Sequence, residues 1–129
     1  TNGITLAQKL AQRGLKTLLL AGRVKATTDA VIGTEAVASL QHYHFSKGFF
    51  GTNGITVEEG FTTPDIEEAM NKRVAMEHCR KCYVLADASK FEALSNVSFG
   101  SLSKGVIITA AQEGLNVRSY KQHTEVIVL

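Results

Sequence analysis

The chain has 129 residues, with 14 basic and 12 acidic side chains, a formal net charge of +2 and 44% hydrophobic residues. These values fit a single globular domain of ordinary composition, and the absence of any basic run excludes an electrostatic footprint for nucleic acid. No apolar stretch approaches the roughly 20 residues of a membrane span, and the polar start is unlike a secretory signal. Two cysteines make no disulfide framework, so the cytoplasm is the expected location.

The first part of the chain alternates helical patterns with apolar runs. Thr34 is the predicted cap of the second helix, and Asn53-Gly54 is a predicted turn after the last strand. The predicted elements are a helix over 3–14, a strand over 16–21, a loop over 22–29, a short strand over 30–32, a helix over 34–41 and a strand over 45–51.

The second part of the chain opens with the clearest helix start. Pro64 suits the first helical position and Thr63 the cap before it. The elements predicted from there are a helix with an apolar stripe over 66–76, strands over 81–86 and 104–109, a short helix over 111–114 and a strand over 125–129. Alternating helices and apolar strands predict one α/β domain over 1–129, with a mostly parallel open sheet covered by helices.

Three of the apolar runs end in polar loops. In an open α/β sheet, ligands bind beyond the carboxyl ends of parallel strands, so these loops are expected to share one edge. Cationic side chains suit an anion, Asp and Asn suit hydroxyl groups, and glycines allow close approach. The implied ligand is small, polar and anionic, with a sugar phosphate as the leading candidate. The candidate residues in these loops are Arg23, Gly51, Thr52, Asn53, Gly54, Asp87 and Lys90.

Two charged pairs have plain structural interpretations beside the functional one. Asp87 and Lys90 could hold sugar hydroxyls and a phosphate, or form a weak surface ion pair in a turn. Glu68 and Lys72 stand four residues apart, in the favourable order for an ion pair on one helix face.

The cysteines and histidines do not indicate a metal or redox centre. Cys79 and Cys82 have the spacing of a zinc or redox pair, but no second pair follows, so buried structural cysteines are expected. His42 and His44 flank Tyr43 with no acidic or cysteine partner nearby. No metal and no cofactor are predicted.

Several of these motifs resemble the C-terminal effector-sensing domain of DeoR-family repressors. The resemblance rests on Asp87-Ala88-Ser89-Lys90-Phe91 after a strand, on Gly60-Phe61-Thr62-Thr63-Pro64-Asp65 before a helix that carries Glu68 and Lys72, on the Gly51 loop and on Thr1-Asn2. It covers nearly the whole chain, although the residues from Asn116 onward are generic. Within the family, the stretch over 62–69 resembles the fructose operon repressors of Gram-positive bacteria.

The resemblance implies a fold similar to ribose-5-phosphate and glucosamine-6-phosphate isomerases, and a response to phosphorylated sugars. It assigns Asp87 and Lys90 to the inducer site, and places Asn2, Glu68 and Lys72 near the ligand. It also implies a homo-oligomer and an N-terminal winged helix-turn-helix that binds operator DNA. That module, together with the first strand and phosphate loop of the sensing domain, is missing before Thr1. The chain is therefore expected to be an N-terminally truncated sensing domain.

The expected function is effector binding by a transcriptional repressor of sugar metabolism, with fructose 1-phosphate as the first candidate effector. The alternative is a sugar-phosphate isomerase on the same fold, which needs a carboxylate to move a proton. The related isomerases carry an acid in the loop where this chain has Asn53, and an amide cannot act as a base. Glu58 and Glu59 lie outside the matched position, so no enzyme activity is expected.

Overall fold

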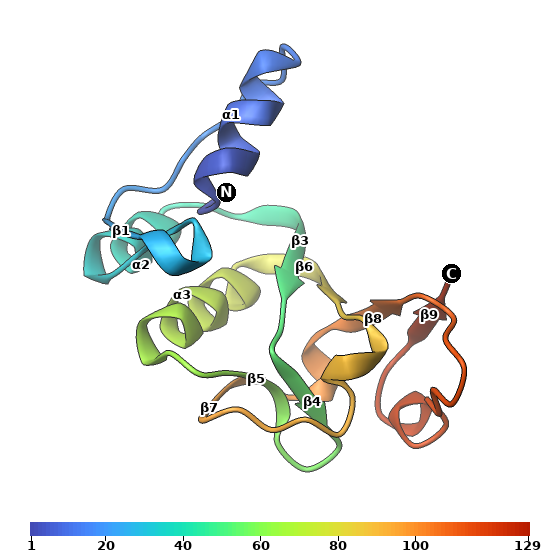
Figure 1. Ribbon diagram of the computed structural model, residues 1–129. Helices are drawn as coiled ribbons and strands as arrows, with labels where there is room; N and C mark the ends of the chain where they lie inside the picture. Colours follow the sequence, from blue (N-terminus) through green and yellow to red (C-terminus); the bar gives the residue numbers. More distant parts are fainter.

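A four-stranded parallel sheet forms the centre of the computed structural model, which describes all 129 residues. Its strands are hydrogen-bonded in the order β3-β6-β8-β9, and every neighbouring pair is parallel (Figure 1). This confirms the predicted α/β fold, with each of these strands placed to within two residues. The bounds are Phe45–Gly51 for β3, Cys79–Leu85 for β6, Val106–Thr109 for β8 and Val126–Val128 for β9.

A second, antiparallel sheet adjoins the carboxyl end of β3 (Figure 1) and was not predicted. Its strands have three or four residues each, which is too short for the alternation that identifies a strand in a sequence. The predicted turn at Asn53-Gly54 is placed differently, because Gly54 is already the first residue of β4. The strands, in the order β4-β5-β7, are Gly54–Thr56, Gly60–Thr63 and Val97–Gly100.

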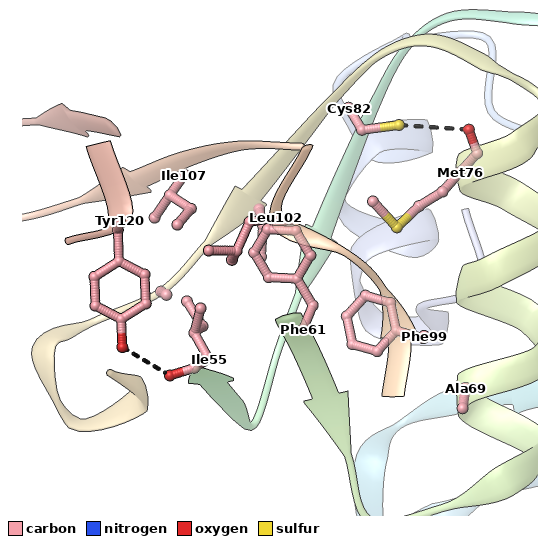
Figure 2. Packing of buried hydrophobic residues seen from close by; sticks show 11 residues of the cluster. Ile55, Phe61, Ala69, Met76, Cys82, Phe99, Leu102, Ile107 and Tyr120 are labelled. Atoms are coloured by element: carbon pink, nitrogen blue, oxygen red, sulfur yellow. Dashed lines mark hydrogen bonds between the residues drawn. The ribbon is translucent and has the colours of Figure 1, made fainter. Parts of the chain in front are cut away.

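One hydrophobic core joins the two sheets to helix α3 (Ile66–Glu77). Phe61 of β5 is fully buried, and its ring centroid lies 6.1 Å from that of Phe99 in β7. The buried hydroxyl of Tyr120 donates to the carbonyl oxygen of Ile55 at 3.1 Å (Figure 2). The loops at the carboxyl end of the parallel sheet are therefore attached to a single packed unit.

The helix caps differ by one or two residues from those predicted. Asp65 caps α3, because its Oδ1 accepts from the backbone N–H groups of Glu67 at 2.8 Å and Glu68 at 3.1 Å. Thr63, the predicted cap, belongs to β5 instead, and Asp is as good a capping residue as Thr. Thr34 is likewise the first residue of α2 (Thr34–Leu40) rather than its cap, a position that Gly33 occupies.

The strand predicted over 16–21 is wrong. Helix α1 (Ile4–Gln12) lies apart from the two sheets in Figure 1, and the extended segment that follows it belongs to no sheet. Its backbone hydrogen bonds to another segment go to Thr1, whose amino group donates to the Leu18 carbonyl while the Leu20 N–H donates to the Thr1 carbonyl. Leu18 is 58% exposed. An apolar run without a neighbouring strand cannot complete its ladder.

The remaining segments are short. The loop predicted over 22–29 contains strand β1 (Arg23–Lys25) and one turn of 3-10 helix, and β1 pairs antiparallel with the correctly predicted β2 (Ala30–Ile32). The helix predicted over 111–114 is wrong, since this segment is a turn with Gly114 at a φ of +80°. The 3-10 turns are η1 (Ala26–Thr28), η2 (Ala88–Lys90), η3 (Leu102–Lys104) and η4 (Tyr120–Gln122). None of the helices combines the length and apolar character of a membrane span.

Candidate functional site

Two of the three predicted polar loops leave the parallel sheet at the same edge. Gly51, the last residue of β3, is the parallel partner of Leu85, the last residue of β6. The loops that follow therefore start side by side, as the sequence predicts. The third loop does not join them, because its preceding run is not a strand and Arg23 lies in β1.

The loop after β3 is held by its own side chains. The buried hydroxyl of Thr52 lies 2.8 Å from the carbonyl oxygen of Gly54 and 3.0 Å from that of Thr62. Asn53 is exposed, and its Oδ1 accepts from the Thr63 hydroxyl at 3.0 Å. The backbone N–H of Asn53 donates to the Thr62 carbonyl at 3.0 Å, whereas its side-chain nitrogen Nδ2 makes no hydrogen bond within the protein and is free to donate to a ligand.

Gly54 brings this loop against the loop that follows β6. A Cβ atom at Gly54 would lie 2.2 Å from the carbonyl oxygen of Ala93, so only glycine fits. Next to it, Ile55 forms an isolated parallel bridge with Phe91, and its carbonyl accepts from the Glu92 N–H at 2.9 Å. The two predicted loops are thus in direct contact.

Asp87 is exposed and begins the turn η2. Its Oδ1 accepts from the Ser89 N–H at 2.8 Å and from the Ser89 hydroxyl, and these bonds lower the pKa of the Asp87 carboxyl. No ion pair joins Asp87 to Lys90. Asp87 lines an open cavity of about 500 Å³ together with Glu92, Gln112 and Asn116.

Lys72 is a half-buried cation among the predicted site residues. It lies on α3, and its Nζ donates to the carbonyl oxygen of Gly51 at 2.9 Å and sits 5.0 Å from the ring centroid of Phe99. No carboxylate oxygen comes within 4.0 Å of it, and burial lowers the pKa of its ammonium group. An ammonium group in this position is available to an anion.

Lys72 lines a cavity of about 390 Å³ between α1, β3 and α3. Asn2 and Gly51, two other predicted site residues, line the same cavity. Asn2 is anchored on β2, because its side-chain nitrogen donates to the Val31 carbonyl at 3.2 Å and its own carbonyl accepts from the Val31 N–H at 2.7 Å. Asn53 and Lys90 line neither this cavity nor the one beside Asp87.

The ion pair between Glu68 and Lys72, which is the structural alternative to a role at the ligand, does not form within 4.0 Å. Glu68 accepts from Lys25 at 3.1 Å and from the Thr28 hydroxyl at 2.9 Å, both in the segment around β1. Arg23 pairs with Glu67 at the start of α3. Arg23 and Glu68 therefore contribute to the contact between the β1–β2 hairpin and α3.

Lys25 is the residue at this contact that the sequence did not indicate. Its Nζ lies 2.8 Å from Asp65 and 3.1 Å from Glu68. Hydrogen bonds to Asp65 and then to Glu68 raise the pKa of Lys25, and the bond to Lys25 is the main reason that the pKa of Asp65 is lowered. Nothing in the sequence distinguishes Lys25 from a solvated lysine.

Replacing Asp65 with alanine is expected to lower the free energy of unfolding at pH 7 by about 1 kcal/mol, because the cap of α3 is lost. The lowered pKa of Asp65 means that its ionised form favours the folded state. This contribution is present above the ordinary pKa of an aspartate and disappears as the pH falls through the folded value. Urea denaturation at pH 7 and below pH 3 tests this. A variant that loses the same stability at both pH values would contradict the assignment.

The cysteines and histidines form no second site. Cys82 is buried, its Sγ donates to the Met76 carbonyl at 3.5 Å, and burial raises its pKa to about 11. His44 stacks on His78 with ring centroids 5.6 Å apart. No three of the His, Cys, Asp and Glu side chains gather in a group that could hold a metal ion.

Comparison with known proteins gives one consistent family. The family described as "DeoR C terminal sensor domain" matches residues 1–111. The chain is similar to the "Uncharacterized HTH-type transcriptional regulator FruR" of Bacillus subtilis (strain 168), at 40% identity over 129 residues, which are 100% of this chain and 51% of the relative. It is also similar to the HTH-type transcriptional regulator GlpR of Haloferax volcanii, at 35% identity over 81% of this chain and 41% of the relative.

A third relative is the lactose phosphotransferase system repressor of Streptococcus mutans serotype c. It is 31% identical over 98% of this chain and 52% of its own length. The chain spans about half the length of these curated relatives.

Proposed function

Because this chain belongs to the DeoR family through its C-terminal sensor domain, we propose that it binds a phosphorylated sugar that modulates operator binding by the full-length repressor. The observation that carries this proposal is the position of the Lys72 ammonium group. Lys72 is a half-buried lysine whose ammonium group has no carboxylate partner within 4.0 Å and is held at the carboxyl end of β3 by the Gly51 carbonyl. An ionised phosphate oxygen would complete its hydrogen bonding.

The proposal also includes three predicted residues that do not line the Lys72 cavity, namely Asn53, Asp87 and Lys90 on the loops that follow β3 and β6. The side-chain nitrogen Nδ2 of Asn53 can donate a hydrogen bond to a hydroxyl oxygen of the sugar. The exposed carboxylate of Asp87 can accept hydrogen bonds from hydroxyl groups. Lys90, three residues after Asp87, supplies a second cation to the same loop. We propose that these residues act at one site because the loops that carry them are in contact at Gly54 and Ile55.

Fructose 1-phosphate is the effector that we propose first, because the stretch over 62–69 resembles the fructose operon repressors. Operator binding belongs to a DNA-binding domain outside this chain, in a cytoplasmic homo-oligomer. For a ligand to act on the operator it must bind two states of the protein with different affinity. The test is a titration of the full-length protein on operator DNA with fructose 1-phosphate, fructose 6-phosphate and inorganic phosphate. Failure of every phosphorylated sugar to bind would overturn the proposal.

The same protein is expected to show no isomerase turnover above background on these sugar phosphates. Asn53 cannot remove a proton, and Glu58 and Glu59 line a separate cavity with Arg73 and Lys104, not the one that contains Lys72. A coupled assay for ketose–aldose conversion tests this. Turnover that survives Asn53→Ala and disappears with Glu58→Ala would show that Glu58 is the catalytic base.

We also propose that a further strand, contributed by polypeptide preceding Thr1, lies between residues 16–20 and β3. The hydrogen bonds of Thr1 to Leu18 and Leu20 follow the parallel ladder pattern. Across the cavity the other edge of β3 has no partner, and apolar residues of both segments line the space between them. The proposed strand would pack against the apolar residues of the two segments that line the cavity.

This arrangement predicts that backbone amides over 17–20 exchange with solvent more slowly in the full-length protein than in the 129-residue chain. The amides over 82–84 of β6 are the control, because β6 lies between β3 and β8 in the parallel sheet and their exchange should not differ between the two proteins. Equal exchange over 17–20 in the two proteins would contradict the proposal. Slow exchange that depends on protein concentration would instead indicate that a second copy fills the space.

A further inference from the structure

Asn71 is the one buried side chain whose hydrogen bonding the protein does not complete. It lies on α3 directly before Lys72, is 3% exposed and lines the same cavity. Its Nδ2 donates to the Val31 carbonyl at 3.3 Å, whereas its Oδ1 is buried without a partner. It is the only buried side-chain oxygen or nitrogen in the protein left in that condition.

A buried acceptor without a donor destabilises the folded state, so such groups call for an explanation. The hydrogen bond from Asn71 to Val31 does not explain why an asparagine is buried here. The Val31 carbonyl already accepts from Asn2 at 3.2 Å, so an apolar residue at position 71 would leave it satisfied. Apolar residues, among them Leu40 and Ala75, line the same cavity as Asn71, so a leucine at position 71 would face apolar surroundings. The missing donor is therefore best sought among groups that enter the cavity.

We propose that Asn71 is a ligand-binding residue, whose Oδ1 accepts a hydrogen bond from a hydroxyl group of the sugar phosphate. The proposal rests on the proposed function, and it adds the residue that recognises the sugar rather than its phosphate. The neighbouring Lys72 presents an ammonium group to the cavity that Asn71 lines.

The pair has complementary chemistry. An ammonium group binds an ionised phosphate, while a neutral carbonyl oxygen accepts from a hydroxyl and gains nothing from an ionised phosphate. Asn71 is therefore expected to increase the affinity for sugar phosphates and not the affinity for inorganic phosphate. Sites that hydrogen-bond a substrate hydroxyl reject analogues lacking it, because the buried polar group is then left unpaired.

The experiment uses the full-length protein, with calorimetric titration of fructose 1-phosphate, of its analogues that each lack one hydroxyl group, and of inorganic phosphate. For the wild type, one analogue should bind about 10-fold more weakly, which corresponds to about 1.4 kcal/mol. Asn71→Leu should bind fructose 1-phosphate about 10-fold more weakly, lose discrimination against that one analogue, and keep its affinity for inorganic phosphate. Met70→Leu, at the preceding and exposed position of α3, is the matched control and should bind as the wild type does.

Thermal melts separate binding from folding. Asn71→Leu removes the unpaired acceptor and is expected to melt at or above the wild-type temperature. If it does not fold, Asn71→Ala is titrated in its place. A folded variant that binds fructose 1-phosphate and every analogue as tightly as the wild type does would overturn the assignment of Asn71 while leaving the proposed function intact. If the wild type binds no phosphorylated sugar, the proposed function fails, and the assignment fails with it.

Discussion

Replacing Lys72 with alanine is expected to weaken effector binding by the full-length repressor about 10- to 100-fold, because hydrogen bonds to charged groups contribute about 1.5–3 kcal/mol. The repressor should still bind its operator but require correspondingly more fructose 1-phosphate to release it. Titration of operator release against fructose 1-phosphate measures the shift. Since burial lowers the pKa of Lys72, wild-type affinity should also fall as the pH rises toward that pKa, where the ammonium loses its proton.

Lys81→Ala is the matched control. Lys81 also lies above an aromatic ring, with Nζ 5.4 Å from the ring centroid of Tyr83, but it is exposed on β6. Its loss should leave the release midpoint unchanged. Lys90→Ala completes the set, because the sequence assigned the phosphate to Lys90. A shift with Lys90→Ala and none with Lys72→Ala would move the phosphate from the cavity to the loop after β6.

The parallel sheet could be predicted because each of its strands contains a short apolar run, and because a clear helix start at Pro64 separates the first two of them. Phe45–Gly51 was predicted with its exact bounds, and Gly51 and Leu85 end side by side as expected. The antiparallel sheet could not be predicted, because Gly60–Thr63 is buried along its whole length and its neighbours are too short to show a period. The run over 16–21 shows the opposite error, since its apolar residues are typical of a strand but no neighbouring strand is present to pair with.

The placement of the candidate residues was predictable where it depends on strand ends, and their side-chain partners were not. The sequence placed Asn53 and Asp87 on adjoining loops, and the contact of Gly54 with Ala93 agrees. The spacing of Glu68 and Lys72 favoured a pair within the helix, yet Glu68 instead binds Lys25, a residue 43 positions earlier in the chain. Such partners across the fold have no periodic signal. The same applies to Asn71, whose burial against Val31 depends on how the β1–β2 hairpin packs on α3.

Phe61→Ala is expected to have the largest effect on stability, about 3–5 kcal/mol, since a fully buried phenylalanine is removed from a packed core. The midpoint of thermal unfolding should fall by roughly 10 °C or more. Phe49→Ala is the matched control, because Phe49 is 62% exposed on β3 and its ring stacks on that of Tyr83, with the centroids 5.1 Å apart. It should cost only about 1 kcal/mol. Calorimetry of both variants measures the difference.

The shape of the Phe61→Ala transition tests how the two sheets are connected. Phe61 belongs to the antiparallel sheet but shares one core with Val84 and Ile107 of the parallel sheet. Its loss should therefore lower the stability of both sheets together, in a single cooperative transition. Two separate transitions would show that the antiparallel sheet unfolds independently. In that case the loop over 51–54, which joins β3 to β4, could not be held rigidly beside Lys72. If Phe49→Ala proved as destabilising as Phe61→Ala, the exposed face of β3 would be covered in solution.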